Sequence, residues 1–327
     1  MIFRIILITL YSLTLYATPT WYHNLTKQGP SFYIGYGQGF SEVDAKKAAL
    51  NDISSQISVI VDSSISSDMG INKGKTYKNI QDKSSLRSHA QIQGYTVKKL
   101  EFYQGHYYIA LSYENIPSID KFNRKLTYIP LDKKPKIYNR YLQQTPIAQK
   151  LEKKVDFSLS RKDGIWYIQY KDIYQALDEK DFLYFFTTVN SSSLSITTSK
   201  YKNVLYDGDE FFFKLKSKEK GYVTIFTVYE DGTVTKLISN IYVQKNKTEY
   251  IPDKDFESIL QAGLLEAGKE TFDLYIVVRT SKKQHFDQFA RADEELISDE
   301  RYKNFDELIE LMGEMEFVTL KLVTKPR

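Results

Sequence analysis

The sequence predicts an α+β protein: a small N-terminal α/β domain, in which a helix packs on antiparallel strands, and then a β-sandwich-like C-terminal domain with one late helix. An amphipathic helix pattern after residue 41 is followed by a hairpin pattern. Strand patterns become dense from about residue 194, and a helical stripe returns only after residue 304. The 327 residues are enough for about two domains at roughly 150 residues each.

The composition excludes several classes of protein. With 42% hydrophobic and 26% charged residues, the chain is neither disordered nor of low complexity. Its net charge of +4 is small for its length, so we expect no nucleic-acid partner. The absence of cysteine from the sequence excludes disulfides, thiolate metal sites, a cysteine nucleophile and lipidation of a cysteine.

Residues 1–17 have the layout of a secretory signal peptide. A short basic start precedes an apolar run over Ile5–Tyr16 and the small residue Ala17. The run is too short to span about 30 Å of hydrocarbon as a helix. Cleavage is expected after Ala17, although Leu15 is larger than the small residue preferred at its position. A buried N-terminal strand and an uncleaved anchor are the alternatives.

Residues 18–117 are expected to form the N-terminal α+β domain. Phe32–Gly39 is typical of a short strand that runs into a glycine turn, and Ser41 is placed to cap a helix. The apolar stripe of that helix, at spacings of four and three, comprises Ala45, Ala49, Ile53, Ile57 and Ile60. Past Gln56 the residues also alternate as a strand does, so the end of the helix stays open.

The rest of this domain is predicted to be a loop and a hairpin. Residues 62–88 are rich in Ser, Asp, Lys and Gly, which indicates a long loop or the ragged start of a strand. Tyr95–Tyr103 and His106–Glu114 are rich in β-formers and predict two strands joined at Gln104–Gly105. The domain is expected to end near Pro117.

Residues 118–194 are interpreted as a connector that contains a hairpin. Prolines interrupt this Lys- and Tyr-rich stretch at Pro130, Pro135 and Pro146. Thr145–Pro146 predicts the start of a short helix with proline in its first position. Phe157–Tyr170 predicts a hairpin that turns at Asp163–Gly164.

Residues 195–327 are expected to form the β-rich domain. Phe272–Arg279 is nearly apolar throughout, as a central strand buried on both faces would be. Asn304 and Glu307 predict a capping box that starts the late helix, and Gly313 ends it. The stripe of that helix comprises Phe305, Leu308, Ile309 and Met312. The other expected strands are Glu210–Lys216, Gly221–Tyr229, Thr233–Ile238 and Glu316–Lys325, with a turn at Asp231–Gly232.

Three glycines between a strand and a helix raise the possibility of a phosphate-binding loop. Gly35, Gly37 and Gly39 would allow backbone N–H groups to approach an anion. Their spacing departs from the dinucleotide fingerprint, and no Lys-Ser/Thr pair ends the loop. A tight structural turn is therefore the favoured interpretation.

Acidic residues gather at two places. Asp207, Asp209 and Glu210 offer oxygen ligands for Ca²⁺ but lack the EF-hand spacing, so a solvated turn is favoured. The second group precedes the late helix, where negative charge is routine, and comprises Asp293, Glu294, Glu295, Asp299 and Glu300. No carboxylate pair for hydrolysis stands out among so many acids.

The other reactive side chains show no catalytic pattern. Serine runs near residues 54, 63, 66 and 191 lack a nucleophile-elbow context. The four histidines are scattered along the chain at His23, His89, His106 and His285. The many aromatic side chains could stack on sugars or bases, but β-rich cores account for them first. We therefore expect no catalytic, cofactor-binding or metal-binding residues, and a protein that is not an enzyme.

Three stretches of the N-terminal domain resemble a family of twenty-kilodalton outer-membrane lipoproteins of the Helicobacter and Campylobacter group: Pro19–Trp21, Tyr33–Gly39 and Asp44–Val59. The resemblance covers about residues 19–115. Members of this family include FlgP, which builds the flagellar basal disk. The sequence has no lipobox cysteine, so the resemblance does not extend to an acyl anchor.

The C-terminal half, near Leu205–Phe211 and Lys220–Val234, resembles a β-rich domain of unknown function in exported bacterial proteins. The two resemblances imply a periplasmic structural protein of the flagellar motor basal disk, needed for motility and associated with the outer membrane through partners. The implied partners are a FlgP-like lipoprotein and other motor proteins in a multi-subunit ring. The alternative is a periplasmic module that binds an envelope glycan or lipid. Neither interpretation requires a cofactor.

The signal peptide gives the first testable prediction. Mass spectrometry of the periplasmic fraction is expected to find a chain that begins at Thr18, because the peptidase removes the segment that precedes it. An intact Met1 start in an inner-membrane pellet would contradict the prediction.

Overall fold

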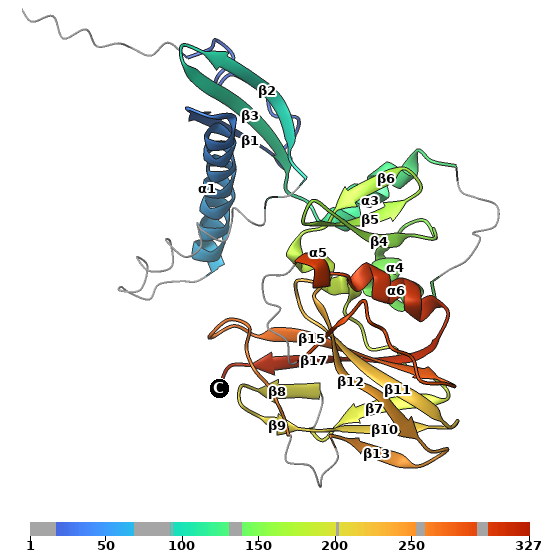
Figure 1. The fold of residues 1–327 in the computed structure, drawn as a ribbon. Coiled ribbons are helices and arrows are strands. Elements are labelled where there is room, and N and C mark those ends of the chain that lie inside the picture. Colours follow the sequence, from blue (N-terminus) through green and yellow to red (C-terminus); the bar gives the residue numbers. More distant parts are fainter. Residues whose placement is uncertain are drawn as a thin grey trace, which may run out of the picture. The chain divides into compact units, whose positions relative to one another are not determined.

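Figure 1 shows the fold of the protein in a computed structural model, which describes residues 18–68, 92, 94–130, 139–200, 203–252, 259–292 and 300–327, with only the backbone for 58–68. The chain divides into two compact units, Met1–Ile116 and Pro117–Arg327. The structure contains helices and several β-sheets, and strands dominate the second unit. This confirms the α+β class. The expected signal peptide, residues 1–17, lies outside the described residues.

In its described residues, unit 1 is a three-stranded antiparallel sheet with one helix on a face. Its elements are β1 (Phe32–Gly39), α1 (Glu42–Asp68), β2 (Thr96–Tyr103) and β3 (His106–Glu114). The strand order is β1-β3-β2, so β3 is central and β2 is an edge strand. The predicted hairpin turn is confirmed, and Gln104 and Gly105 have φ of 48° and 83°, the left-handed values that a tight hairpin turn requires.

The three glycines lie on the surface of β1 against which α1 packs, and they do not form a turn. The strand β1 continues through Gly39, so the expected glycine turn is wrong. A Cβ atom on Gly37 would lie 1.9 Å from the carbonyl oxygen of Ala45, and one on Gly35 would lie 2.1 Å from that of Ala49. The glycines alternate along one face of β1, and the absence of their side chains allows the helix backbone to approach the strand.

Helix α1 confirms the cap and most of the stripe predicted for it. Ser41 Oγ accepts from the backbone N–H of Asp44 at 3.1 Å, and Ala45, Ala49 and Ile53 are fully buried against the sheet. The backbone remains helical to Asp68, which resolves the ambiguity past Gln56 and replaces the start of the expected loop with helix. The side chain of Ile60 lies outside the described residues.

Unit 2 contains the other elements of the described residues. Its helices and helical turns are α3 (Ser118–Thr127), η1 (Leu142–Gln144), α4 (Pro146–Lys150), α5 (Glu179–Phe182), η2 (Leu183–Phe185), η4 (Glu300–Tyr302) and α6 (Phe305–Gly313). Its strands are β4 (Ser158–Lys162), β5 (Ile165–Tyr170), β6 (Ile173–Ala176), β7 (Leu194–Thr198), β8 (Val204–Tyr206), β9 (Glu210–Phe211), β10 (Phe213–Ser217), β11 (Gly221–Val228), β12 (Val234–Val243), β13 (Thr248–Ile251), β14 (Leu260–Gln261), β15 (Thr271–Thr280), β16 (Ala290–Arg291) and β17 (Glu316–Lys325).

A six-stranded sheet in the order β16-β12-β11-β15-β17-β8 forms the middle of unit 2. Strand β15 lies inside this sheet, as its apolar sequence predicted. Its even-numbered residues Leu274 and Ile276 belong to one hydrophobic cluster, and its odd-numbered residues Tyr275 and Val277 belong to another. The sheet therefore separates two cores.

Each core has its own second layer. On one face, strands of the sheet β7-β10-β13 contribute Leu215 and Ile251 to the sandwich core. On the other face, the helices α3, α4 and α6 and the small sheet β4-β5-β6 contribute an aromatic-rich core. Figure 1 shows α6 and the small sheet on the side of the six-stranded sheet away from β10 and β13.

Residues 118–194 are part of unit 2, which corrects their interpretation as a connector. Trp166 of β5 donates from Nε1 to the carbonyl oxygen of Asp231 at 3.1 Å, and its ring fills the space where a Cβ on Gly232 would clash. Phe182 stacks on Trp166 at a centroid distance of 5.0 Å. A fragment starting at residue 195 would lose this wall of the aromatic core. The predicted helix start at Pro146 and the Asp163–Gly164 hairpin are both confirmed.

The late helix and the last strand agree closely with the sequence patterns. The stripe residues of α6 are all buried, and β17 spans the predicted range, Glu316–Lys325. The expected capping box is wrong, because the Asn304 side chain makes no cap hydrogen bond and instead donates to the carbonyl oxygen of Gln288 at 3.2 Å. The strand expected at Glu210–Lys216 is divided at Phe212 into β9 and β10.

The close approach of α1 to the glycines of β1 predicts the effect of a substitution on stability. Gly37→Ala is expected to lower the free energy of unfolding of unit 1 by about 3 kcal/mol, because its Cβ meets helix backbone that has no flexible end to move. Gly29→Ala is the control, since its Cβ would find only the Phe32 ring at 3.6 Å. Urea unfolding followed by Trp21 fluorescence, in a Trp166→Phe background, measures both. Equal stability of the two variants would contradict the close approach.

Candidate functional site

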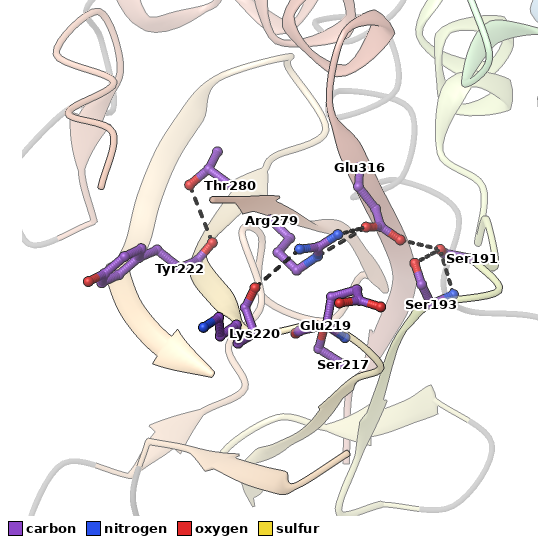
Figure 2. Close-up of polar contacts among 9 residues, drawn as sticks. All are labelled: Ser191, Ser193, Ser217, Glu219, Lys220, Tyr222, Arg279, Thr280 and Glu316. Carbon is purple, nitrogen blue, oxygen red and sulfur yellow. Dashed lines mark hydrogen bonds and ion pairs between the residues drawn. The ribbon is translucent and has the colours of Figure 1, made fainter. Parts of the chain in front are cut away.

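A polar cluster lies where β15 ends and β17 begins (Figure 2). Arg279 and Glu316 are ladder partners on these strands, and Arg279 Nε donates to Glu316 Oε2 at 3.0 Å. The Arg279 Nη2 atom contacts the same oxygen, and Ser191 Oγ donates to Glu316 Oε1 at 3.1 Å. The two charged side chains are only 17% and 21% exposed, so solvent screens their attraction less than at an open surface.

We call the polar cluster of Figure 2 the Arg279 cluster. Several of its other contacts involve main-chain groups. Arg279 Nη1 donates to the carbonyl oxygen of Lys220 at 3.4 Å, and Thr280 Oγ1 donates to that of Tyr222 at 3.4 Å. Ser217 Oγ donates to the carbonyl oxygen of Glu219 at 2.6 Å. The first two bonds join the start of β11 to the end of β15, and the Ser217 bond lies within the turn that precedes β11.

The Arg279 cluster does not have the parts of a nucleophilic site. Ser191 bonds to a carboxylate that the Arg279 guanidinium already binds through two of its nitrogens. Activation of a serine needs a base with a matched pKa and a third group that orients the base. The nine residues drawn in Figure 2 contain no histidine. The cluster therefore acts as a clasp between strands.

A second polar group lies near the other end of β15. Glu230 Oε1 accepts from the backbone N–H of Phe272 at 2.7 Å. Burial, together with the neighbouring Glu230 carboxylate, raises the pKa of Asp273 to about 7. Burial also raises the pKa of Glu230, and Lys321 lies over the Phe272 ring at 4.5 Å. A perturbed carboxyl of this kind often marks a functional site, but desolvation at a strand end produces the same shift.

The first acidic group from the sequence is a turn. Asp209 Oδ2 accepts from the backbone N–H of Tyr206 at 3.0 Å, and Arg327 Nη2 lies 3.1 Å from Asp209 Oδ1. The hydrogen bond to Tyr206 is the main cause that lowers the pKa of Asp209. The Asp209 oxygens therefore bind the Tyr206 N–H of the turn and the Arg327 guanidinium. Asp207 and Glu210 are not assembled with Asp209 into an oxygen cage for Ca²⁺.

Of the second acidic group, residues 293–299 lie outside the described residues. Glu300 belongs to η4 and contacts Arg161 and Lys303, with Lys303 Nζ 3.0 Å from its Oε1 atom. These contacts lower the pKa of Glu300, so it remains an exposed anion in an ion-pair network.

The histidines and serines do not come together in the described parts of the chain. The His23 ring packs edge-on against Tyr22 and at a tilt against Tyr36, with ring centroids 4.3 and 4.6 Å away. His106 lies 4.7 Å from the Phe40 ring, whereas His285 is exposed in unit 2 and His89 lies outside the described residues. Ser54 is a buried residue of α1, and Ser55 donates from Oγ to the carbonyl oxygen of Asn51 in the same helix. The side chains near residues 63 and 66 lie outside the described residues.

Strand β2 carries a surface that the sequence reasoning missed. Val97, Leu100 and Phe102 are 50%, 39% and 61% exposed, and we call these three residues the β2 edge patch. They pair with Leu111, Ile109 and Tyr107 of β3, which are on the face that α1 covers. Helix α1 packs mainly on β1 and β3, so this part of the face is left open. Alternation along β2 did not reveal the patch, because a bulge between Val97 and Lys99 changes the side-chain period.

Comparisons with known proteins give little. No family model matches the chain, and no curated protein matches it. Among solved structures, a crystal structure of a secreted protein from the human pathogen Helicobacter pylori aligns with 38% of this chain at 19% identity and a TM-score of 0.21. The aligned part spans 50% of that protein's length. A similarity of this size carries no inference about fold or activity.

Two properties can be stated for the described residues. None of their helices is both long and apolar enough to cross a membrane. Within the same residues, no group of three or more His, Cys, Asp and Glu side chains is arranged to hold a metal ion.

The raised pKa of Asp273 predicts a pH dependence. The unfolded carboxyl has its ordinary pKa of 3.8, whereas burial and the neighbouring Glu230 raise the pKa of the folded carboxyl to about 7. The native state therefore binds more protons between these values, and the contribution of Asp273 to stability is lost as the pH rises through this window. Asp273→Asn, which has no carboxyl to ionise, is expected to lack this loss, with a difference on the order of 1–2 kcal/mol by pH 8.

Thermal unfolding of both proteins from pH 4 to pH 8 measures the effect. Asp163→Asn, at an exposed hairpin turn, is the control for loss of one carboxyl. Parallel pH profiles for the wild-type chain and Asp273→Asn would contradict the prediction.

Proposed function

We propose that the protein is a non-enzymatic structural protein that docks on a partner through the β2 edge patch. The observation that supports this function is an apolar surface on an edge strand of a sheet whose helix leaves it open. Monomeric proteins usually protect such edges with charge, proline or a covering element. Apolar residues gathered at an edge mark a surface that a partner covers.

The aromatic content of the chain favours docking over the binding of a glycan or lipid. The largest fully buried side chains include Tyr108, Tyr141, Phe122, Phe185 and Phe226. Tyr141 contacts Phe305 and Phe317 edge to face in the aromatic-rich core of unit 2. These rings fill cores, so the aromatic richness that motivated a glycan-binding module has a structural explanation.

For the cellular context, we propose export to the periplasm and a place in the flagellar basal disk. The support is the signal-peptide pattern of residues 1–17 and the resemblance of the N-terminal domain to FlgP-like lipoproteins. The two-domain plan without a lipobox resembles FlgQ, a companion of FlgP. In this proposal the partners are the FlgP-like lipoprotein and other motor proteins in a ring, and contact with the outer membrane is made through them.

The test makes the β2 edge patch polar and leaves the core side chains unchanged. Leu100→Asn/Phe102→Asn is expected to abolish motility at normal protein abundance, because it makes the docking surface polar while changing only exposed side chains. Leu265→Asn is the matched control, since Leu265 is 60% exposed in unit 2. Motility and abundance are measured for each variant in cells deleted for the wild-type gene. Full motility of the double variant would contradict docking through β2.

Two further sets of variants separate docking from chemistry. Single alanine substitutions of His23, His89, His106 and His285 are expected to leave motility intact. Ile53→Ala is expected to reduce abundance, because large-to-small core changes cost about 2–5 kcal/mol. A histidine variant that is present at normal abundance but inactive would show catalysis instead of scaffolding.

A further inference from the structure

The outer edge of β2 is open for pairing. In the described part of the chain, β2 pairs with β3 along one edge, and no strand pairs with its other edge. The backbone N–H and C=O groups on that edge are a template for a further strand. The edge is eight residues long, which is an ordinary length for a strand that pairs on both sides.

The two faces of β2 have different chemistry. Val97, Leu100 and Phe102 are on the α1 face, as their pairing with β3 shows. Lys99 and Glu101 are on the other face, because their ladder partners Ala110 and Tyr108 belong to the cluster on that side of the sheet. One face of the edge is thus apolar, and the other carries one positive and one negative charge two residues apart.

We propose that two copies of this chain associate through antiparallel pairing of their β2 strands, with a twofold axis at Leu100. This inference rests on the proposed docking function and names its occupant as a second copy. In this register Lys99 lies opposite Glu101 of the other copy, twice, on one face. On the other face the two Leu100 side chains meet at the axis, and each Phe102 lies opposite Lys98, the exposed residue at the bulge of the other copy.

Other registers are less favourable. An axis at Glu101 would place two carboxylates opposite each other, and an axis at Lys99 would do the same with two ammonium groups, which is destabilising for cross-strand neighbours. A slip by one residue would place charged side chains beside the apolar patch, because strand side chains alternate between faces. The axis at Leu100 pairs Lys99 with Glu101 and brings the two Leu100 side chains together.

Trp21 holds the charged face in position. Its Nε1 donates to Glu101 Oε2 at 2.5 Å, and Lys99 Nζ lies 5.2 Å from the Trp21 ring centroid. The Glu101 Oε1 atom has no hydrogen-bond partner among the described residues. One carboxylate oxygen is therefore fixed by the indole, and the other remains for a lysine of the second copy.

Charge reversal at the edge tests the register. Sedimentation equilibrium of the purified chain from Thr18 is expected to show a monomer–dimer equilibrium. Lys99→Glu and Glu101→Lys each place like charges opposite one another and are expected to raise the dimer Kd at least tenfold. The double variant Lys99→Glu/Glu101→Lys restores opposite charges and is expected to return the Kd to within about threefold of wild type.

The control is Lys216→Glu, which makes the same charge change at an exposed strand position of unit 2 and is expected to leave the Kd unchanged. Circular dichroism melts confirm that each variant folds. A monomer at all concentrations up to several hundred micromolar would overturn the proposal. So would a dimer that is indifferent to both single variants, or a double variant as weak as the single ones. The measurement uses purified protein, so the motility test of docking stands separately from it.

Discussion

Burial of β15 on both faces is the constraint on which unit 2 depends. A strand with two apolar faces needs a packed layer on each side, and unit 2 supplies a sheet on one side and helices with a small sheet on the other. Neighbouring strands must then alternate to match, as β11 does with Phe226 on the aromatic side and Ile225 on the sandwich side. The Arg279 cluster closes one end of this arrangement, since a polar strand end next to two cores must be hydrogen-bonded.

A different constraint shapes unit 1. An α-helix is about 10 Å wide, and strands in a sheet are about 4.8 Å apart, so one helix covers about two strands. The glycines of β1 draw α1 toward that edge of the sheet, against Ala45 and Ala49. The third strand, β2, is therefore left with an open apolar face as a direct result of where the glycines stand. The position of α1 on the sheet and the exposure of the β2 edge patch therefore have the same cause, the glycines of β1.

Patterns that are local in sequence predicted most elements. The hairpins at Gly105 and Gly164, the stripe of α6 and the bounds of β17 follow from turn chemistry and side-chain period alone. The sequence predictions that failed depend on contacts between residues that are not neighbours in the sequence. The helix backbone above Gly37, the Trp166 ring on Gly232 and the alternative partner of Asn304 leave no mark in a short window of sequence. For the same reason the β2 edge patch was missed, because its exposure depends on which strands α1 covers.

The position of β17 also affects the order in which the chain can fold during synthesis. Strand β17 lies between β15 and β8, and Thr319 on it accepts from the backbone N–H of Val189 at 2.8 Å. The six-stranded sheet therefore remains incomplete until residues 316–325 have emerged from the ribosome, whereas the described strands of unit 1, β1, β2 and β3, have emerged by residue 114. Domains generally fold as units, with the N-terminal one first. Unit 2 must wait for its last strand, and chaperones that hold unfolded chains have the whole of that interval in which to bind it.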